Sequence, residues 1–332
     1  MEDEAPVRIF DDDPNVYISV VNRQRKWYYY NPDDKPLGAG AMGKVFLGYD
    51  YDTNRRVAIK QLFDKYANVK SVRDRSQLEA SLAYSHPNIV EMLGSCMYED
   101  EDGYWHVWVL SNYVDGVNID KYVADLTDPI VRTETVCRLI CDVLGAMDYL
   151  HAKGVVHRDI KPSNIMVDRE GQVKLMDLGI ARVTSANAYT GTGFVGTPLY
   201  ASPEQIMRDK MQVQATAASD IYSLGMTLYV LLNGTHPFDA DTEAQILVNQ
   251  MTKRLPVVEI LPKKYKSLMP VIWKATDKDP EKRYQSALDF KNDIEKALVS
   301  KAKPWWQSWW MGVVAFIVTY VLMRLILRLI VS

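Results

Sequence analysis

Residues 157–165 read H-R-D-I-K-P-S-N-I, and D-L-G follows at residues 177–179. The first run brings a histidine, an arginine, an aspartate, a lysine and an asparagine within nine positions. Toward the N-terminus, V-A-I-K ends at Lys60, and G-A-G-A-M-G occupies residues 38–43. The four runs in this order are far more specific than any one of them, so their combination decides the fold and the chemistry that we expect.

The glycine run is the weakest of these signals when it is taken alone. The spacing of Gly38, Gly40 and Gly43 also occurs in dinucleotide-binding folds. Glycines allow the backbone to approach phosphate oxygens and to direct N–H groups at them. Here Val45 and a strand-like stretch follow, and not the start of a helix. This order argues against a dinucleotide-binding fold and favours a phosphate-binding loop between strands.

Lys60 lies in R-R-V-A-I-K-Q-L-F, an alternating stretch rich in β-branched residues, which predicts a strand. A lysine on a strand is usually a solvated surface group, but here its ammonium would project toward the phosphates of the glycine run. With the runs at residues 157–165 and 177–179 added, the chain resembles a serine/threonine protein kinase of the eukaryotic-like (bacterial Hanks) type. The resemblance covers roughly residues 27–298.

The resemblance implies an α+β, bilobal protein kinase fold. Its N-lobe is a small antiparallel β-sheet with one main helix, its C-lobe is α-rich, and ATP and Mg²⁺ bind in the cleft between them. A C-terminal transmembrane helix is added to this fold. The predicted segments are an N-terminal extension (1–26), the N-lobe (27–115), the C-lobe (116–300), a juxtamembrane linker (301–308) and the transmembrane helix (309–332).

The resemblance also implies a role for each matching residue. Asp159 would accept the proton of the incoming hydroxyl, while Lys161 and Lys60 would neutralise phosphate charge. Asn164 and Asp177 would supply the hard oxygen ligands that Mg²⁺ prefers. The residues expected to contact the nucleotide are Leu37, Gly38, Ala39, Gly40, Ala41, Met42, Gly43, Lys44, Val45, Ala58, Lys60, Glu79, Asn112 and Val114.

Other matching positions indicate the acceptor and the supporting structure. Lys161 and the run G-T-P-L-Y at residues 196–200 point to serine or threonine as acceptor, because tyrosine kinases carry an arginine pattern near the first position. Asp220 is expected to tie the backbone of the catalytic loop from a buried helix. Glu204 is expected to pair with Arg283, and a buried acid with a single partner is costly to break.

The segment between the D-L-G run and Glu204 contains several hydroxyl residues and glycines. With so few apolar side chains to pack, we do not expect packing alone to hold this segment in one conformation. We hypothesise that phosphate on Thr190 or Thr192 pairs with Arg158 and orders this segment. The alternative is a loop softened by glycines, in which the threonines are incidental.

Three positions depart from the family pattern. The helix glutamate that pairs with the strand lysine usually stands nine residues before His86, where this chain has Gln77, whereas Glu79 stands seven before. Either Glu79 serves, which we favour, or Lys60 is held by Asp177 and phosphate alone. D-L-G replaces the commoner D-F-G and leaves the metal ligand intact. A small residue, Ser111, is expected at the gatekeeper position beside adenine.

Residues 309–332 are apolar apart from two arginines, a serine and a threonine, and they contain no proline. As a helix they would span about 36 Å, enough for a hydrocarbon core of about 30 Å. Four tryptophans and two lysines between residues 301 and 310 are typical of a membrane interface with cytoplasmic positive charge. We therefore predict a single-pass membrane protein with its kinase domain in the cytoplasm. A helix lying on the membrane surface and a buried core helix are the alternatives.

Composition limits the classes of partner. A net charge of −3 creates no overall field that would attract nucleic acid. Three cysteines without a metal-ligand pattern are typical of a reducing compartment. The expected partners are protein substrates, a lipid bilayer and a second copy for phosphorylation in trans. The alternative function is a membrane-tethered pseudokinase scaffold that binds nucleotide without transfer, whereas G-T-P-L-Y and S-P-E disfavour a small-molecule kinase.

Overall fold

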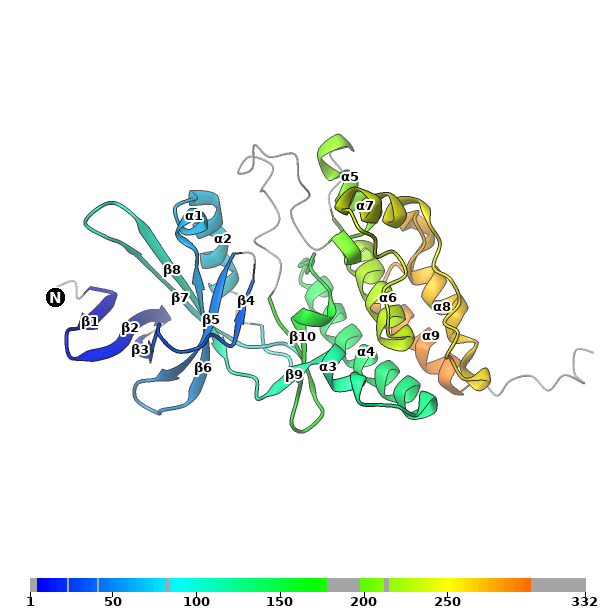
Figure 1. Cartoon of the computed structure of the whole chain (residues 1–332), viewed down its shortest axis with the longest axis horizontal. Helices are drawn as coiled ribbons and strands as arrows, with labels where there is room; N and C mark the ends of the chain where they lie inside the picture. The colour runs from blue at the N-terminus through cyan, green and yellow to red at the C-terminus, as the bar shows by residue number, and fades with distance from the viewer. Residues whose placement is uncertain are drawn as a thin grey trace, which may run out of the picture.

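The computed structural model describes residues 5–22, 24–40, 42–81, 84–177, 198–211 and 215–299. The described residues form a β-rich part and a helical part, which Figure 1 shows side by side and joined near β9 and β10. This arrangement matches the predicted bilobal α+β architecture. No helix in these ranges is long and apolar enough to cross a membrane. The predicted transmembrane segment, residues 309–332, lies outside the described residues.

Within the described residues, the N-lobe contains an eight-stranded sheet. The strands pair in the order β1-β2-β3-β5-β6-β8-β7, with β4 on β5, and every pairing is antiparallel. The strands are β1 (Val7–Phe10), β2 (Asp13–Asn22), β3 (Gln24–Tyr30), β4 (Gly38–Ala39), β5 (Gly43–Asp50), β6 (Arg56–Leu62), β7 (Met92–Glu99) and β8 (Trp105–Asn112).

Alternation along β5, β6 and β8 gives this sheet two different faces. Phe46, Ile59 and Leu110 lie opposite one another in register and are at most 3% exposed. They form one core with Tyr30 and Trp108, whose indole Nε1 donates a 2.8 Å hydrogen bond to the Tyr30 hydroxyl. The residues between them point to the other face, which is the face that carries Lys60.

Residues 7–22, which the sequence assigns to an N-terminal extension, are part of this sheet. Strand β2 pairs with β3, and Ile18 and Val20 are buried in the same core. A Cβ at Gly94 on β7 would stand 2.2 Å from Val20 Cγ1, so glycine allows β2 to cross closely over β7. The predicted boundary at Trp27 therefore falls inside β3 and separates β2 from the sheet to which it belongs. Alternation of apolar and polar residues predicts such strands, but which strands they pair with depends on the twist and curvature of the whole sheet.

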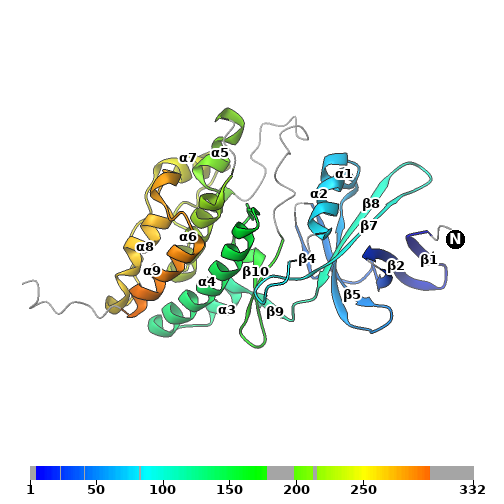
Figure 2. The ribbon, with the colours of Figure 1, turned by 180° about the vertical axis from the view of Figure 1, so that it is seen from behind.

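The described helices are α1 (Asp64–Ala67), α2 (Lys70–Ser81), α3 (Ile119–Ala124), α4 (Pro129–Ala152), α5 (Pro203–Met211), α6 (Ala217–Asn233), α7 (Glu243–Thr252), α8 (Leu268–Ala275) and α9 (Ala287–Val299). Short 3₁₀ turns are η1 (Pro162–Asn164), η4 (Pro198–Tyr200), η5 (Lys263–Tyr265) and η6 (Pro280–Lys282). Helices α1 and α2 follow β6 and lie against the sheet, and the helices from α3 onward form the C-lobe (Figure 2).

Two long helices organise the C-lobe core. Helix α4 begins where the Asp128 side chain accepts hydrogen bonds from the N–H groups of Ile130 and Val131. Helix α6 begins with a capping box between Thr216 and Ser219 and ends at Gly234 in the left-handed conformation. Both helices bury apolar side chains in one cluster, which also contains Cys137 and Cys141 of α4. The buried positions of both cysteines agree with a structural role as small apolar residues.

A second, three-stranded sheet lies at the junction of the lobes. It contains β9 (Gly116–Asn118), β10 (Ile165–Asp168) and β11 (Val173–Leu175) in the order β11-β10-β9. The loop before β7 is hydrogen-bonded to β11: Val90 N donates to Leu175 O, and Leu175 N donates to Asn88 O. This loop therefore joins the N-lobe to the strand that leads to Asp177.

Glu204 and Arg283 form the ion pair that the sequence predicts. Arg283 donates from Nη1 to Oε1 at 2.7 Å and from Nη2 to Oε2 at 2.9 Å, and its side chain is fully buried. Ser219 Oγ also donates to Glu204 Oε1. Burial raises the pKa of Glu204, but the hydrogen bonds and charge of Arg283 outweigh it, so the pKa lies below its ordinary value. The pair joins α5 to η6 and α6.

We predict that Arg283→Ala lowers the free energy of unfolding by about 3–5 kcal/mol, because Glu204 would stay buried without its partner. Arg138→Ala is the matched control: Arg138 forms a half-exposed pair with Asp142, so its loss should cost under about 1 kcal/mol. Urea unfolding of both variants at pH 7 measures the difference. An Arg283→Ala loss no larger than that of the control would contradict a structural role for the pair.

The same variant should show a characteristic pH dependence. In the wild type, the lowered pKa of Glu204 gives stability that is present above its ordinary pKa and is lost as pH falls through the folded-state value. In Arg283→Ala burial, the largest effect on this group, is opposed only by the hydrogen bonds from Ser219 and the backbone, so the pKa of Glu204 rises and acid relieves the buried charge. The stability gap between the two proteins is therefore widest at neutral pH and narrows toward pH 4.

Candidate active site

The carboxylate of Asp220 on α6 holds the backbone of the catalytic loop, residues 157–165. Asp220 of α6 is fully buried, and its two oxygens accept hydrogen bonds from the backbone N–H groups of His157 and Arg158, both at 2.7 Å. Arg158 has a φ of +66°, a left-handed conformation that costs a non-glycine residue about 1–2 kcal/mol. Two charge-assisted hydrogen bonds offset this cost, so Asp220 makes the contact that the sequence predicts.

His157 connects the catalytic loop to the D-L-G run. Its Nδ1 accepts from Asp159 N at 3.3 Å, and its Nε2 lies 3.0 Å from Met176 O. The two contacts require an Nε2–H tautomer, which donates to the carbonyl. Burial lowers the pKa of His157, in agreement with a neutral ring. We assigned no role to this residue from sequence, although its place beside Asp159 was a signal that could have suggested one.

The polar side chains of the loop converge on Asp159. Lys161 Nζ lies 3.1 Å from Asp159 Oδ2. Asn164 Nδ2 donates to the same Oδ2 at 3.0 Å and to the Asp159 carbonyl at 2.8 Å. Because the Asn164 amide nitrogen faces Asp159, the amide oxygen points elsewhere and is the atom that Asn164 would offer to a metal ion.

Asp177 and Lys60 come from different lobes and meet at this loop. Lys60 Nζ on β6 lies 3.1 Å from Asp177 Oδ1, and Met176 N donates to Asn164 O at 2.9 Å. Asp177 also has a positive φ, +50°. The Lys60 charge lowers the pKa of Asp177, which keeps the carboxylate ionised. The structure thus brings Lys60, Asp177 and the catalytic loop together.

The second face of the N-lobe sheet continues this site. Val45 lies opposite Lys60, Leu47 lies opposite Ala58, and Ala58 lies opposite Ser111, so these side chains share the Lys60 face. All five side chains are half-buried, in contrast to the closed core on the other face. Leu47 was missed from sequence, although stepping by two residues from Val45 would have found it.

The glycine run forms β4 and the turn into β5. Gly40 N donates to Gly43 O at 2.9 Å, which closes the turn. A Cβ at Gly43 would stand 2.1 Å from Gln61 O, so packing against β6 requires glycine there. A Cβ at Gly38 or Gly40 would meet nothing within 4 Å. Open space beside these two residues fits a backbone that a phosphate can approach.

Other predicted nucleotide contacts have different positions. Leu37 and Lys44 are exposed, and Ala39 pairs with Lys44 across the turn. The Met42 side chain packs against the cluster beneath α1 and α2, so it belongs to the core of the N-lobe. Asn112 donates to Glu91 Oε2 at 2.9 Å, so its side chain is turned away from the Lys60 face.

Several predicted residues cannot be placed. Ala41, Thr190 and Thr192 lie outside the described residues, and so does the side chain of Glu79, although its backbone belongs to α2. Among the described side chains, Asp177 is the acid that contacts Lys60.

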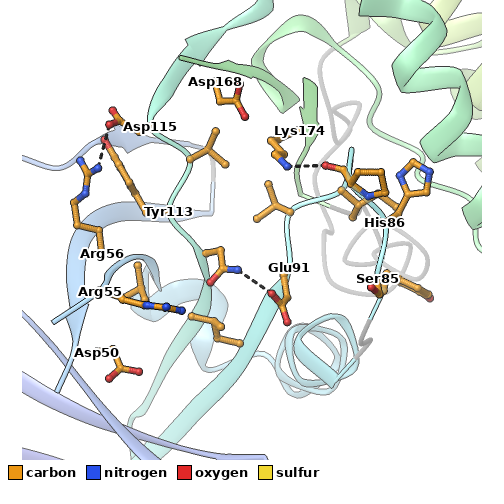
Figure 3. Close-up of a pocket in the computed structure, with 18 of the residues that line it drawn as sticks. Asp50, Arg55, Arg56, Ser85, His86, Glu91, Tyr113, Asp115, Asp168 and Lys174 are labelled. Carbon is orange, nitrogen blue, oxygen red and sulfur yellow. Dashed lines mark hydrogen bonds and ion pairs between the residues drawn. The ribbon is translucent and has the colours of Figure 1, made fainter. Parts of the chain in front are cut away.

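A cavity of about 810 Å³ lies at the junction of the lobes, and Figure 3 shows its lining. Its walls come from the N-lobe sheet, from the loop before β7, from residues 112–115 and from the β10–β11 turn. Lys174 Nζ donates to Pro87 O, and Arg56 pairs with Asp115. Asn112 and Val114 line it, but Lys60 and Asp159 do not. The cavity is therefore separate from the candidate active site.

The site residues fit Mg²⁺ and a nucleoside triphosphate. Asp177 and Asn164 offer oxygen ligands, Lys60 and Lys161 offer positive charge, and the backbone at Gly38 and Gly40 is open. No group of three or more His, Cys, Asp or Glu residues that could hold a metal occurs in the described ranges. Mg²⁺ needs no such group, because phosphates and water usually complete its coordination.

Comparisons with known proteins support this interpretation. The chain is 36% identical over 266 residues to the serine/threonine-protein kinase PrkC of Bacillus subtilis, covering 79% of this chain and 39% of PrkC. It is 34% identical over 265 residues to the probable serine/threonine-protein kinase PknB of Lactococcus lactis, covering 78% of this chain and 40% of PknB. The chain thus spans about two fifths of the length of these relatives.

A solved structure is similar as well. A double mutant of the PknI kinase domain from Mycobacterium tuberculosis matches with a TM-score of 0.60 and 25% identity, over 80% of this chain and 94% of that one. Residues 32–296 match the family described as protein kinase domain, which is most of the chain. Fold, site geometry and family match agree, and the chain belongs to the protein kinase family.

Proposed function

We propose that this chain is a serine/threonine protein kinase that transfers the γ-phosphate of ATP to hydroxyls of protein substrates. The observation that carries the proposal is the convergence of Asp159, Lys161 and Asn164 with the Lys60–Asp177 pair. The names of the bacterial relatives support serine and threonine as acceptors. A nucleotide-binding scaffold without transfer is less favoured, because Lys60, Asp159, Asn164 and Asp177 are all present.

Each residue has a task that its geometry suits. Asp159 would accept the hydroxyl proton and orient the acceptor oxygen, and the donors on its Oδ2 hold the carboxylate in place. Lys161 and Lys60 would stabilise negative charge on the phosphoryl oxygens. Asn164 and Asp177 would hold Mg²⁺, which supplies further charge neutralisation when bound with ATP.

Regulation and self-association are further proposals that rest on sequence. Phosphate on Thr190 or Thr192 would pair with Arg158 and nearby bases and order the segment before α5. Association of two copies would allow phosphorylation in trans. The composition of residues 178–197 and the arginine that precedes Asp159 support this proposal.

Membrane attachment is likewise proposed from sequence. Residues 309–332 would form a spanning helix, and Lys301 and Lys303 ahead of the tryptophans favour a cytoplasmic kinase domain. Helix α9, the last described helix, ends at Val299, so the proposed anchor would follow the C-lobe after the short linker at residues 301–308.

We predict that Asp159→Asn lowers kcat by about 10²–10⁴-fold, because the proton acceptor is lost, while KM for ATP changes little. Transfer of labelled phosphate from ATP to casein and to the chain itself, with Mg²⁺, measures both constants. Asp168→Asn is the matched control, since Asp168 accepts backbone hydrogen bonds in the β10–β11 turn and should leave kcat unchanged. Wild-type protein that transfers no phosphate would refute the proposed function.

We predict that Glu79→Gln lowers kcat/KM for ATP by roughly tenfold, because an acid on α2 would help to hold Lys60 toward the phosphates. Gln77→Ala, an exposed position on the same helix, is the control and should be silent. Steady-state kinetics at varied ATP concentration measure kcat/KM for the wild type and both variants. An unchanged Glu79→Gln enzyme would leave Asp177 and phosphate as the groups that hold Lys60.

We predict that the full chain stays in the membrane fraction after an alkaline carbonate wash and is released by detergent, as a spanning helix requires. A chain ending at residue 300 should appear in the supernatant and retain phosphate transfer, since the described fold ends at Val299. Release of the full chain by carbonate alone would favour a helix on the membrane surface.

A further inference from the structure

Gln205 in the first turn of α5 connects two parts of the active site. Its Nε2 donates to the carbonyl of Arg158 at 3.0 Å. Its Oε1 accepts from Ser202 N at 3.0 Å and from Ser202 Oγ at 3.1 Å. The amide cannot be reversed, because a reversed amide would face a carbonyl with its oxygen and an N–H group with its nitrogen.

The Arg158 carbonyl belongs to the peptide bond that leads to Asp159. The N–H of the same peptide donates to His157 Nδ1, so both ends of this peptide are held by side chains. The preceding peptide is held by Asp220, and Arg158 between them has a positive φ. A rotation of the Arg158–Asp159 peptide would move the Asp159 Cα and its carboxylate.

Helix α5 is itself firmly anchored. Glu204, the neighbour of Gln205, points the other way into the buried ion pair with Arg283. The first turn of α5 therefore has one side chain fixed in the C-lobe core and the next fixed on the catalytic loop. We propose that Gln205 is a positioning residue for phosphoryl transfer, which orients Asp159 through the Arg158–Asp159 peptide. This inference rests on the proposed function.

The simpler explanation is a helix cap. Ser202 and Gln205 have the spacing of a capping box, in which the N3 side chain accepts from the N-cap N–H. Glutamate serves that role as well as glutamine, and its charge favours a helix N-terminus. An ionised glutamate cannot donate to the Arg158 carbonyl and repels it, so Gln205→Glu keeps the cap and breaks the contact with the catalytic loop.

The experiment compares the full-length wild type with Gln205→Glu and Gln205→Leu, using transfer of labelled phosphate from Mg·ATP to casein and to the chain itself. Gln245→Glu is the matched control, because Gln245 donates within its own helix α7 to Asn249. For Gln205→Glu at pH 8 we expect a roughly tenfold lower kcat, since one hydrogen bond to the loop is lost. KM for ATP and the melting temperature should stay near the wild-type values.

A lower kcat at unchanged KM for ATP and unchanged melting temperature separates positioning from a structural effect, because a loss of helix packing would lower the melting temperature as well. Glutamate has an ordinary pKa of about 4.3, and a helix N-terminus favours its charged form, so Gln205→Glu stays ionised and the ratio of its kcat to that of the wild type should stay low from pH 8.5 to 5.5. The Gln205→Leu ratio should stay low throughout. Should Gln205→Leu unfold, Gln205→Glu decides alone.

The activity of the wild type separates failure of this inference from failure of the proposed function. An inactive wild type refutes the function itself. An active wild type with an equally active Gln205→Glu variant makes Gln205 a helix cap and overturns the inference. An equal loss in Gln245→Glu would assign the effect to the added charge and would also overturn it.

Discussion

The buried carboxylate of Asp220 is the contact on which the active site depends. A buried charge is tolerated only when hydrogen bonds replace its hydration. Asp220 accepts from two backbone N–H groups and lies 2.8 Å from His151 Nε2 at the end of α4. It therefore joins α6, α4 and the catalytic loop at one point, and both helices lie in the apolar core of the C-lobe. The left-handed turn at Arg158 is thus held by a carboxylate whose helix is packed in this core.

From that point a chain of polar contacts leads to the N-lobe. His157 joins the turn to Met176, Asp177 follows directly, and Lys60 reaches it from β6. The loop before β7 adds a second connection, through the backbone hydrogen bonds of Asn88 and Val90 with β11. The Lys60 face of the sheet is thus held over the catalytic loop by contacts at two separate places, while the cavity of Figure 3 lies at the same junction without any of the catalytic side chains.

The C-lobe supports the segment that leads into α5 in a similar way. The carbonyl of Leu199, just before α5, receives hydrogen bonds from the side chains of His236 and Gln250. Burial lowers the pKa of His236 to about 4, so the ring stays neutral and donates from Nε2. Gln250 is held in turn by the Tyr222 hydroxyl at 2.5 Å. Together with the pair of Glu204 and Arg283, these contacts give residues 198–205 a rigid base.

Sequence alone determined which residues make up the candidate site and the class of fold. The order of glycine run, strand lysine, catalytic loop and D-L-G identifies the groups, and alternation or helical periodicity reports which side of a local element is apolar. Such periodicity carries no information on partners far along the chain. Tertiary structure decided that residues 7–22 close the N-lobe core, that Met42 packs inward, that His157 bridges two loops and that Gln205 reaches Arg158 across 47 residues. These contacts depend on how whole elements pack, because hydrogen bonds form only where packing brings a donor within about 3 Å of an acceptor.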